Sequence, residues 1–176
     1  HHEDIMSSLS QLKADVLASY QPEKLAAEGK KKRILVTGCP IGGVLDKTVK
    51  LLEKSGAVVV CHENCSGYKA AYQMVDAEAP DIYRAIAERY LEIGCSVMSP
   101  NPVRMELLPR LVDAFKVDGV VEVVLQACTA YSVEAHNLRN AVQAMGLPYL
   151  GIETDYSTAD QGQLRTRIEA FVELMD

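Results

Sequence analysis

The chain has 176 residues, of which 48% are hydrophobic and 24% charged, which is enough for one globular domain with a substantial core. Its net charge of −6 and its scattered lysines and arginines argue against a nucleic-acid-binding protein. No apolar run approaches the about 18 residues that a membrane span needs, and the polar N-terminus is unlike a signal peptide. We therefore expect a cytoplasmic protein that binds neither nucleic acid nor membrane.

Helices and strands are predicted to alternate from the N-terminus onward. Residues 3–20 carry apolar side chains at helical spacing, whereas the polar residues 21–32 are predicted to form a linker. The apolar run 33–37 is typical of a strand that is buried on both faces. After a turn, a helix over 44–55 and a strand over 57–61 are expected.

The second half of the chain continues the alternation. The elements expected there are a loop and helical region over 63–78, a helix over 80–93 capped by Asp81 or the residues before it, a loop over 95–104, a helix over 105–115, a strand over 120–125, a helix over 132–145 capped by Ser132, a strand over 149–153 and a helix over 161–175. Strands separated by helices of this length imply a parallel sheet with right-handed crossovers. We predict a three-layer α/β sandwich with a four-stranded parallel sheet, flavodoxin-like or Rossmann-like, preceded by one extra helix. In this division residues 1–32 are a helix and linker and residues 33–176 are the α/β domain.

Cysteines are the most informative residues for function. The chain has five, and four of them fall where a predicted strand gives way to a loop. In an open parallel sheet, ligands bind in the crevice beyond the carboxyl ends of the strands. An odd cysteine count argues against a secreted disulfide framework. Cysteines that converge from distant parts of the chain therefore suggest a metal or iron–sulfur site.

The individual cysteines differ as ligand candidates. Cys39 stands at the start of a predicted helix, where a thiolate has a lowered pKa that suits metal ligation, although a buried cysteine in a tight turn explains it equally well. Cys61 ends a strand and is expected in the core, so Cys65 in the following loop is the better candidate. Cys95 is explained equally well as a ligand and as a residue that merely follows the end of a helix. Cys128 follows the most apolar strand and is expected to be functional. The paired spacing of a zinc site is absent, whereas iron–sulfur ligands need only converge in space.

Four further residues are candidates for binding a cofactor or substrate. Gly42 and Gly43 lie in the turn after the first strand, where backbone comes close to a ligand. Their spacing departs from the dinucleotide fingerprint, and the turn lacks the lysine of a phosphate-binding loop. Tyr131 follows Cys128 by three residues and is expected to flank the same crevice. Glu153 ends the fourth strand, where its carboxylate is suited to bind a substrate group or to cap the last helix.

Five stretches of the chain carry a family resemblance. They are RILVTGCPIGG, ENCSGYKA, ERYLEIGCSVMSPNPVR, DGVVEVVLQACTAYSVEAHNLR and PYLGIETDYSTADQGQLRTRIEAFVELM. With them the chain resembles the 2-hydroxyacyl-CoA dehydratase component D family, which includes benzoyl-CoA reductase subunits and double-cubane-cluster reductases. The resemblance implies a protein of about twice this length, of which this chain is the C-terminal α/β domain preceded by an interdomain helix. It also implies that Cys128 is a cluster ligand and that Cys39 and Cys65 match the additional cysteines of the double-cubane branch.

The resemblance further implies low-potential electron transfer in an anaerobic cytoplasm. The expected cofactor of the intact protein is a [4Fe-4S] cluster or a double cubane, which a separate ATP-dependent iron–sulfur activator protein reduces. The expected substrate is an acyl-CoA, or another small molecule in the reductases, and a homologous subunit is the expected partner. Such a protein is part of a lyase or of an ATP-dependent reductase, and this piece alone is expected to be inactive. The alternatives are a cluster-free structural fragment of the family and an unrelated zinc- or thiol-dependent α/β protein.

Overall fold

The computed structural model describes residues 2–28, 31–39 and 42–175. The chain divides into two compact units, His1–Lys31 and Lys32–Asp176. The first unit contains α1 (His2–Ser19), as predicted, and α2 (Pro22–Glu28), where the sequence predicted a linker. That prediction is wrong because this polar stretch is rich in good helix formers and begins with a proline, which is favoured in the first turn of a helix.

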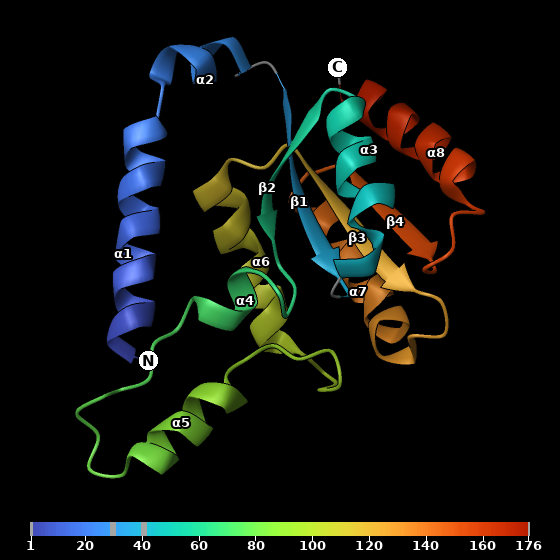
Figure 1. The fold of residues 1–176 in the computed structure, drawn as a ribbon. Coiled ribbons are helices and arrows are strands. Elements are labelled where there is room, and N and C mark those ends of the chain that lie inside the picture. Colours follow the sequence, from blue (N-terminus) through green and yellow to red (C-terminus); the bar gives the residue numbers. More distant parts are fainter. Residues whose placement is uncertain (1, 29–30, 40–41, 176) are drawn as a thin grey trace. The chain divides into compact units, whose positions relative to one another are not determined.

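A four-stranded parallel sheet forms the centre of the second unit. Its strands are β1 (Lys32–Gly38), β2 (Ala57–His62), β3 (Gly119–Leu125) and β4 (Tyr149–Thr154), in the order β2-β1-β3-β4 (Figure 1). This confirms the predicted number, direction and approximate bounds of the strands. Because the chain moves outward from β1 to β2 and then returns to the other side of β1 at β3, the order reverses between β1 and β3. In open α/β sheets a ligand crevice lies at such a reversal.

Helices cover both faces of the sheet and give the predicted three layers. One face packs against α3 (Val49–Lys54) and α8 (Gln161–Glu173), with Leu52 and Ile168 fully buried in that layer. The other face packs against α6 (Pro102–Phe115) and α7 (Thr129–Ala144), with Leu108 and Leu138 buried there. Cys61 lies in this second apolar layer, as predicted for a cysteine of the core.

Three helix starts differ from the predictions. The expected helix over 44–55 is a 3-10 helix, η1 (Gly42–Lys47), followed by α3. Helix α6 begins at Pro102, within the expected loop, because the Asn101 side chain accepts a hydrogen bond from Arg104 N at 3.3 Å and proline is favoured in the first turn. Helix α7 begins directly after Cys128. The Ser132 hydroxyl therefore lies inside the helix and donates to Cys128 O at 2.9 Å, so the prediction that Ser132 caps the helix is wrong.

Between β2 and α6 the chain forms the short helix α4 (Tyr68–Ala71) and then α5 (Ile82–Leu91). Asp81 caps α5 as predicted, because its Oδ1 accepts hydrogen bonds from Tyr83 N and Arg84 N, both at 3.1 Å.

Removing the cap of α5 with Asp81→Ala is expected to lower the free energy of unfolding by about 1 kcal/mol, because two backbone N–H groups lose their acceptor. Chemical denaturation measures the change. The matched control is Glu78→Ala, which removes an exposed carboxylate three residues earlier and is expected to change nothing. Equal effects of the two substitutions would contradict the assigned cap.

Candidate functional site

Two of the predicted cysteines meet at the point where the strand order reverses. Cys39 follows β1, and Cys128 follows β3 and immediately precedes α7. Cys39 is only 2% exposed and packs in one small apolar cluster with Val124 and Tyr131, against which Cys128 also packs. Its Sγ accepts a hydrogen bond from Leu125 N at 3.4 Å. The fold thus places two thiols from distant parts of the sequence at the carboxyl edge of the central strands.

A third cysteine approaches the same tyrosine. Cys65 is exposed, and its Sγ lies 3.9 Å from the Tyr131 hydroxyl. Tyr131 is 5% exposed and packs with Cys39 and Cys128 on its other side, while its binding role stays a prediction. We call Cys39, Cys65 and Cys128, arranged around Tyr131, the thiol rim.

Cys95 differs from these three cysteines. It is half-buried, and its backbone carbonyl accepts a hydrogen bond from Asn101 Nδ2 at 2.9 Å. Within the described residues, no contact is recorded between its sulfur and the thiol rim. Its role as a ligand therefore stays a prediction without support from geometry.

The thiol rim offers the kind of donor atom that an iron–sulfur cluster needs, but too few of these donors. Thiolates are the usual ligands of such clusters. Burial raises the pKa of Cys39 to about 11, which contradicts the lowered pKa that its position before a helix predicted. Cys65 and Cys128 are more accessible and therefore better suited to ligation. Among residues 2–28, 31–39 and 42–175, no group of three or more His, Cys, Asp or Glu side chains is placed to hold a metal ion.

A buried group of charged residues, which the sequence analysis missed, lies on the α6 and α7 side of the sheet. We call it the ionic cluster, and its members are Glu63, Lys69, Arg104, Glu122 and Glu134. Each of the five is at most 5% exposed. Glu63 is the residue after β2, and the other four come from α4, α6, β3 and α7. Buried charges are expensive unless paired, and these five side chains pair with one another in the interior.

Arg104 is the centre of the ionic cluster. Its Nε donates to Glu63 Oε2 at 3.2 Å and its Nη1 to Glu134 Oε2 at 2.5 Å. Its Nη2 donates to Thr37 Oγ1 at 2.8 Å and lies 3.7 Å from Glu122 Oε1. Burial alone would lower the pKa of Arg104, but the surrounding carboxylates outweigh it and raise that pKa. The guanidinium therefore stays charged.

The ionic cluster lies directly beneath the thiol rim. The Arg104 Cζ is 5.1 Å from the centroid of the Tyr131 ring, within the range of a cation–π contact. Burial and the neighbouring Cys65 raise the pKa of Tyr131, so its hydroxyl keeps its proton and can donate it in a hydrogen bond. A fixed positive charge and a hydrogen-bond donor are thus brought to the rim from below.

One sequence signal could have revealed the ionic cluster. Glu122 interrupts the otherwise apolar run VVEVVL, and a carboxylate in a strand that is buried on both faces requires a buried partner. The sequence does not identify that partner, because Arg104 is 18 residues earlier and belongs to another element.

The other predicted binding residues are not members of the apolar cluster that Cys39, Val124 and Tyr131 form. Gly42 and Gly43 are exposed at the start of η1. A Cβ built at Gly43 would lie 2.7 Å from the Tyr156 ring, so this glycine makes room for that ring. Glu153 is exposed at the end of β4 and does not cap α8, whose capping position is occupied by Asp160. It lines a hollow of about 250 Å³ together with Tyr149 and Arg139.

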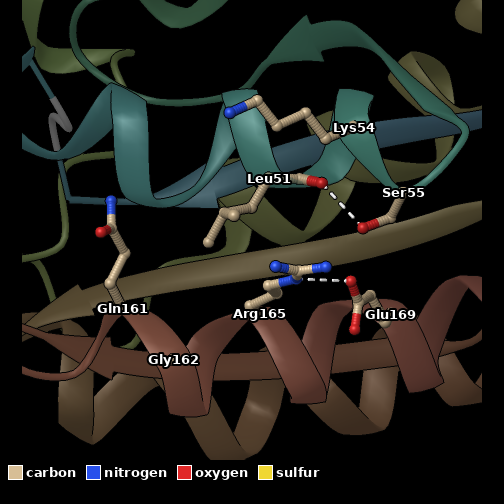
Figure 2. Close-up of a pocket in the computed structure, with 7 residues that line it drawn as sticks. All are labelled: Leu51, Lys54, Ser55, Gln161, Gly162, Arg165 and Glu169. Carbon is tan, nitrogen blue, oxygen red and sulfur yellow. Dashed lines mark hydrogen bonds and ion pairs between the residues drawn. The ribbon is translucent and has the colours of Figure 1, made fainter.

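A larger hollow, of about 430 Å³, lies between α3 and α8 (Figure 2). Its polar groups are partly paired with one another: Arg165 Nε donates to Glu169 Oε1 at 2.7 Å, and the Ser55 hydroxyl donates to Leu51 O at 2.8 Å. The arginine pairs with an acid of its own helix on an exposed surface, and none of the predicted ligands lines this hollow. It is therefore a surface groove without candidate chemistry.

In the part of the chain that the structure describes, no helix is both long enough and apolar enough to cross a membrane.

Comparison with known families decides the assignment of the chain. Residues 1–175 match the family described as 2-hydroxyglutaryl-CoA dehydratase, D-component. The chain belongs to this dehydratase family. The resemblance carried by its five sequence stretches is thereby confirmed. The fold described above, with its thiol rim at the reversal of strand order, is the fold of this dehydratase-family chain.

Individual members of the dehydratase family give the same assignment. A putative dehydratase subunit, YjiM, of Escherichia coli strain K12 is 51% identical over 146 residues, which cover 82% of this chain and 38% of that protein. The beta subunit of (R)-2-hydroxyglutaryl-CoA dehydratase from Acidaminococcus fermentans is 33% identical over 123 residues, 66% of this chain and 32% of that subunit. The beta subunit of (R)-phenyllactyl-CoA dehydratase from Clostridium sporogenes is 24% identical over 145 residues. The chain thus spans well under half the length of these relatives.

Proposed function

We propose that this chain is the cysteine-bearing α/β part of a 2-hydroxyacyl-CoA dehydratase-like or double-cubane reductase-like protein, and that Cys128 and Cys65 are ligands of its iron–sulfur cluster. Membership of the dehydratase family supports the reaction class. The observation that carries the proposal is the meeting of Cys128, Cys65 and Cys39 around Tyr131 at the carboxyl edge of the sheet. That edge is where open α/β sheets bind their ligands.

The residues of this chain have separate roles in the proposal. When bound, the cluster supplies one-electron chemistry at low potential. Cys128 and Cys65 hold it, and the Tyr131 hydroxyl donates a hydrogen bond toward the Cys65 sulfur. Arg104 places a buried positive charge under the ring of Tyr131, which favours negative charge at the rim. Cys39 is the buried member of the rim and stays a protonated thiol, because burial raises its pKa to about 11.

The proposal also includes partners. The rim brings together fewer donors than a cluster needs, so the remaining ligands come from outside the described residues. Two relatives are named beta subunits of acyl-CoA dehydratases, which supports a homologous partner subunit and an acyl-CoA substrate. We include an ATP-dependent iron–sulfur activator protein as the electron donor, because the low potential of such clusters requires a source of energy. A double cubane in place of a single cluster remains within the proposal.

Anaerobic reconstitution of the natural-length protein with iron and sulfide tests the proposed ligands. We expect the protein to bind iron and to show a broad visible absorption band, and we expect Cys128→Ser to lose most of both. Cys61→Ser is the matched control, because Cys61 is buried in the apolar layer and is expected to leave the iron content unchanged.

Three results would contradict the proposal. Iron content that is equal in the two serine variants would show that Cys128 is not a ligand. Tight binding of zinc without iron would indicate an unrelated metal protein, and a folded protein that takes up no metal would indicate a structural fragment without a cluster. Absorption, iron analysis and sulfide analysis distinguish these results.

A further inference from the structure

The charges of the ionic cluster do not balance. It contains three carboxylates, from Glu63, Glu122 and Glu134, and two cations, from Lys69 and Arg104. A buried excess of one negative charge is costly, because Lys69 already pairs with Glu63, and Arg104 already pairs with Glu63 and Glu134. One of the three carboxyl groups is therefore expected to carry a proton.

The contacts identify which acid is least compensated. Glu63 lies 2.9 Å from Lys69 Nζ and accepts hydrogen bonds from Arg104 and Thr37. Glu134 accepts from Arg104 at 2.5 Å and from Asn101 Nδ2 at 2.7 Å. The third acid, Glu122, has no cationic nitrogen closer than the Arg104 Nη2 at 3.7 Å in the described part of the chain. Two of the three acids thus take up the available positive charge.

Burial also disfavours the charged form of Glu122. Glu122 is 1% exposed, and its Oε1 has no hydrogen-bond partner within the described residues. Its Oε2 accepts a hydrogen bond from the Tyr149 hydroxyl, a neutral group. Burial raises the pKa of Glu122, and the carboxylates of Glu63 and Glu134 raise it further against the opposing effects of Tyr149 and Arg104. A carboxyl group in such surroundings is stable in its neutral form.

We propose that Glu122 is a neutral carboxylic acid near pH 7 and that it exchanges its proton with solvent through the Tyr149 hydroxyl, forming a proton-relay site beneath the thiol rim. The proton site does not depend on the proposed function of the rim.

The structure provides a route for the exchange. Glu122 and Tyr149 both line the hollow of about 250 Å³ at the β4 edge of the sheet, together with Ser132 and Arg139. For the exchange the Tyr149 hydroxyl turns from Glu122 Oε2 toward a water molecule in the hollow. Its oxygen then accepts the Glu122 proton while its own hydroxyl proton passes to that water, so the tyrosine stays neutral, Glu122 becomes a carboxylate and the water carries the proton to solvent. Arg139, whose Cζ is 5.3 Å from the Tyr149 ring centroid, disfavours excess protons in the hollow and favours their release.

Every charged group that faces Glu122 bears on its protonation. Arg104 and Tyr149 favour loss of the proton, whereas Glu63 and Glu134 oppose it. The Glu122 carboxylate would also oppose ionisation of Cys39, so the two ends of the site are electrostatically linked. A negative charge that arrives at the rim is then expected to strengthen the hold of Glu122 on its proton, because an ionised Glu122 would add a further uncompensated charge to the interior.

Infrared spectroscopy of the natural-length protein tests the proposal directly. We expect the spectrum near neutral pH to contain the C=O stretching band of a protonated carboxylic acid, which shifts in D₂O and is absent in Glu122→Gln. Glu153→Gln is the matched control, because this exposed acid lines the same hollow and is expected to leave the band unchanged. Tyr149→Phe is expected to retain the band and to slow its shift after transfer to D₂O.

The outcomes separate the two parts of the proposal. A wild-type protein without the band, or a band that persists in Glu122→Gln, overturns the neutral acid. A Tyr149→Phe variant that exchanges as fast as the wild type overturns the relay through the tyrosine. Because the glutamine is isosteric with a protonated glutamate, the Glu122→Gln variant is expected to fold.

A second measurement tests the protonation without spectroscopy. An acid whose pKa is raised on folding stabilises the protein below its unfolded pKa, and this stabilisation is lost as the pH rises through the folded pKa. For Glu122 the loss begins above the ordinary value of 4.5. The test compares the unfolding equilibrium constant of the wild type with that of Glu122→Gln, as a ratio. Above pH 4.5 this ratio is expected to rise by up to about tenfold per pH unit. A ratio that is independent of pH between about pH 5 and pH 7 overturns the proposal.

Discussion

Replacing Arg104 with methionine is expected to lower the free energy of unfolding by about 3–5 kcal/mol, or to prevent folding where that exceeds the stability of the protein. The guanidinium is fully buried and contacts two carboxylates and the Thr37 hydroxyl directly. Its loss leaves Glu63 with Lys69 alone and leaves Glu134 without a cation among the described residues. Methionine fills much of the same volume, so the expected loss reflects uncompensated charge more than a cavity.

Chemical denaturation of matched variants measures this effect. Arg165→Met is the control, because Arg165 pairs with Glu169 on the exposed surface of α8, where a salt bridge contributes little, and its stability is expected to equal that of the wild type. Arg104→Lys is expected to recover only part of the loss, because an ammonium group cannot reproduce the planar contacts to two carboxylates. An Arg104→Met variant that is as stable as Arg165→Met would show that the ionic cluster is not ionised as described.

Replacing Gly38 with alanine is expected to lower the free energy of unfolding by about 3 kcal/mol or more. Gly38 ends β1 with φ +100°, a conformation that residues with a Cβ rarely adopt. A Cβ at this position would lie 2.2 Å from Val123 O in the neighbouring strand β3. Since that atom is backbone in the centre of the sheet, relief of the contact requires β1 and β3 to separate. Cys39 is the next residue, so the substitution is also expected to displace one side of the thiol rim.

Gly42→Ala is the matched control for this prediction. Gly42 has no neighbouring atom within 4 Å of a Cβ and has no positive φ, so the alanine variant is expected to be as stable as the wild type or slightly more stable. Thermal and chemical denaturation of the two alanine variants give the comparison. A Gly38→Ala protein with wild-type stability would contradict the close approach of the two central strands.

Local patterns predicted the sheet well and the helix starts poorly. The runs at 33–37, 57–61, 120–125 and 149–153 are strands, because a short apolar run between turn residues has few other stable structures. Helix α6 begins three residues before its predicted start because the Asn101 side chain caps it and Pro102 occupies its first turn. Helix α7 likewise begins three residues early, directly after Cys128, which has no side-chain cap hydrogen bond.

The candidate site was predicted in part. The positions of Cys39 and Cys128 at strand ends predicted that they would converge, since parallel strands end at one edge of a sheet, and the structure brings them together around Tyr131. Glu153 also ends a strand, but β4 is the outermost strand on its side, so this acid lies by another hollow. Strand ends predict the edge of the sheet on which a residue lies but not its distance from the point where the strand order reverses.

From the sequence alone follow the order of strands and helices along the chain, the cysteines at the strand ends and the resemblance to the dehydratase family, because each is a property of short, contiguous stretches. Only the tertiary structure decided that Arg104 meets Glu63, Glu122 and Glu134 in the interior. The cost of a buried charge depends on partners from other elements, and the sequence separations of 41, 18 and 30 residues give no local signal of those contacts.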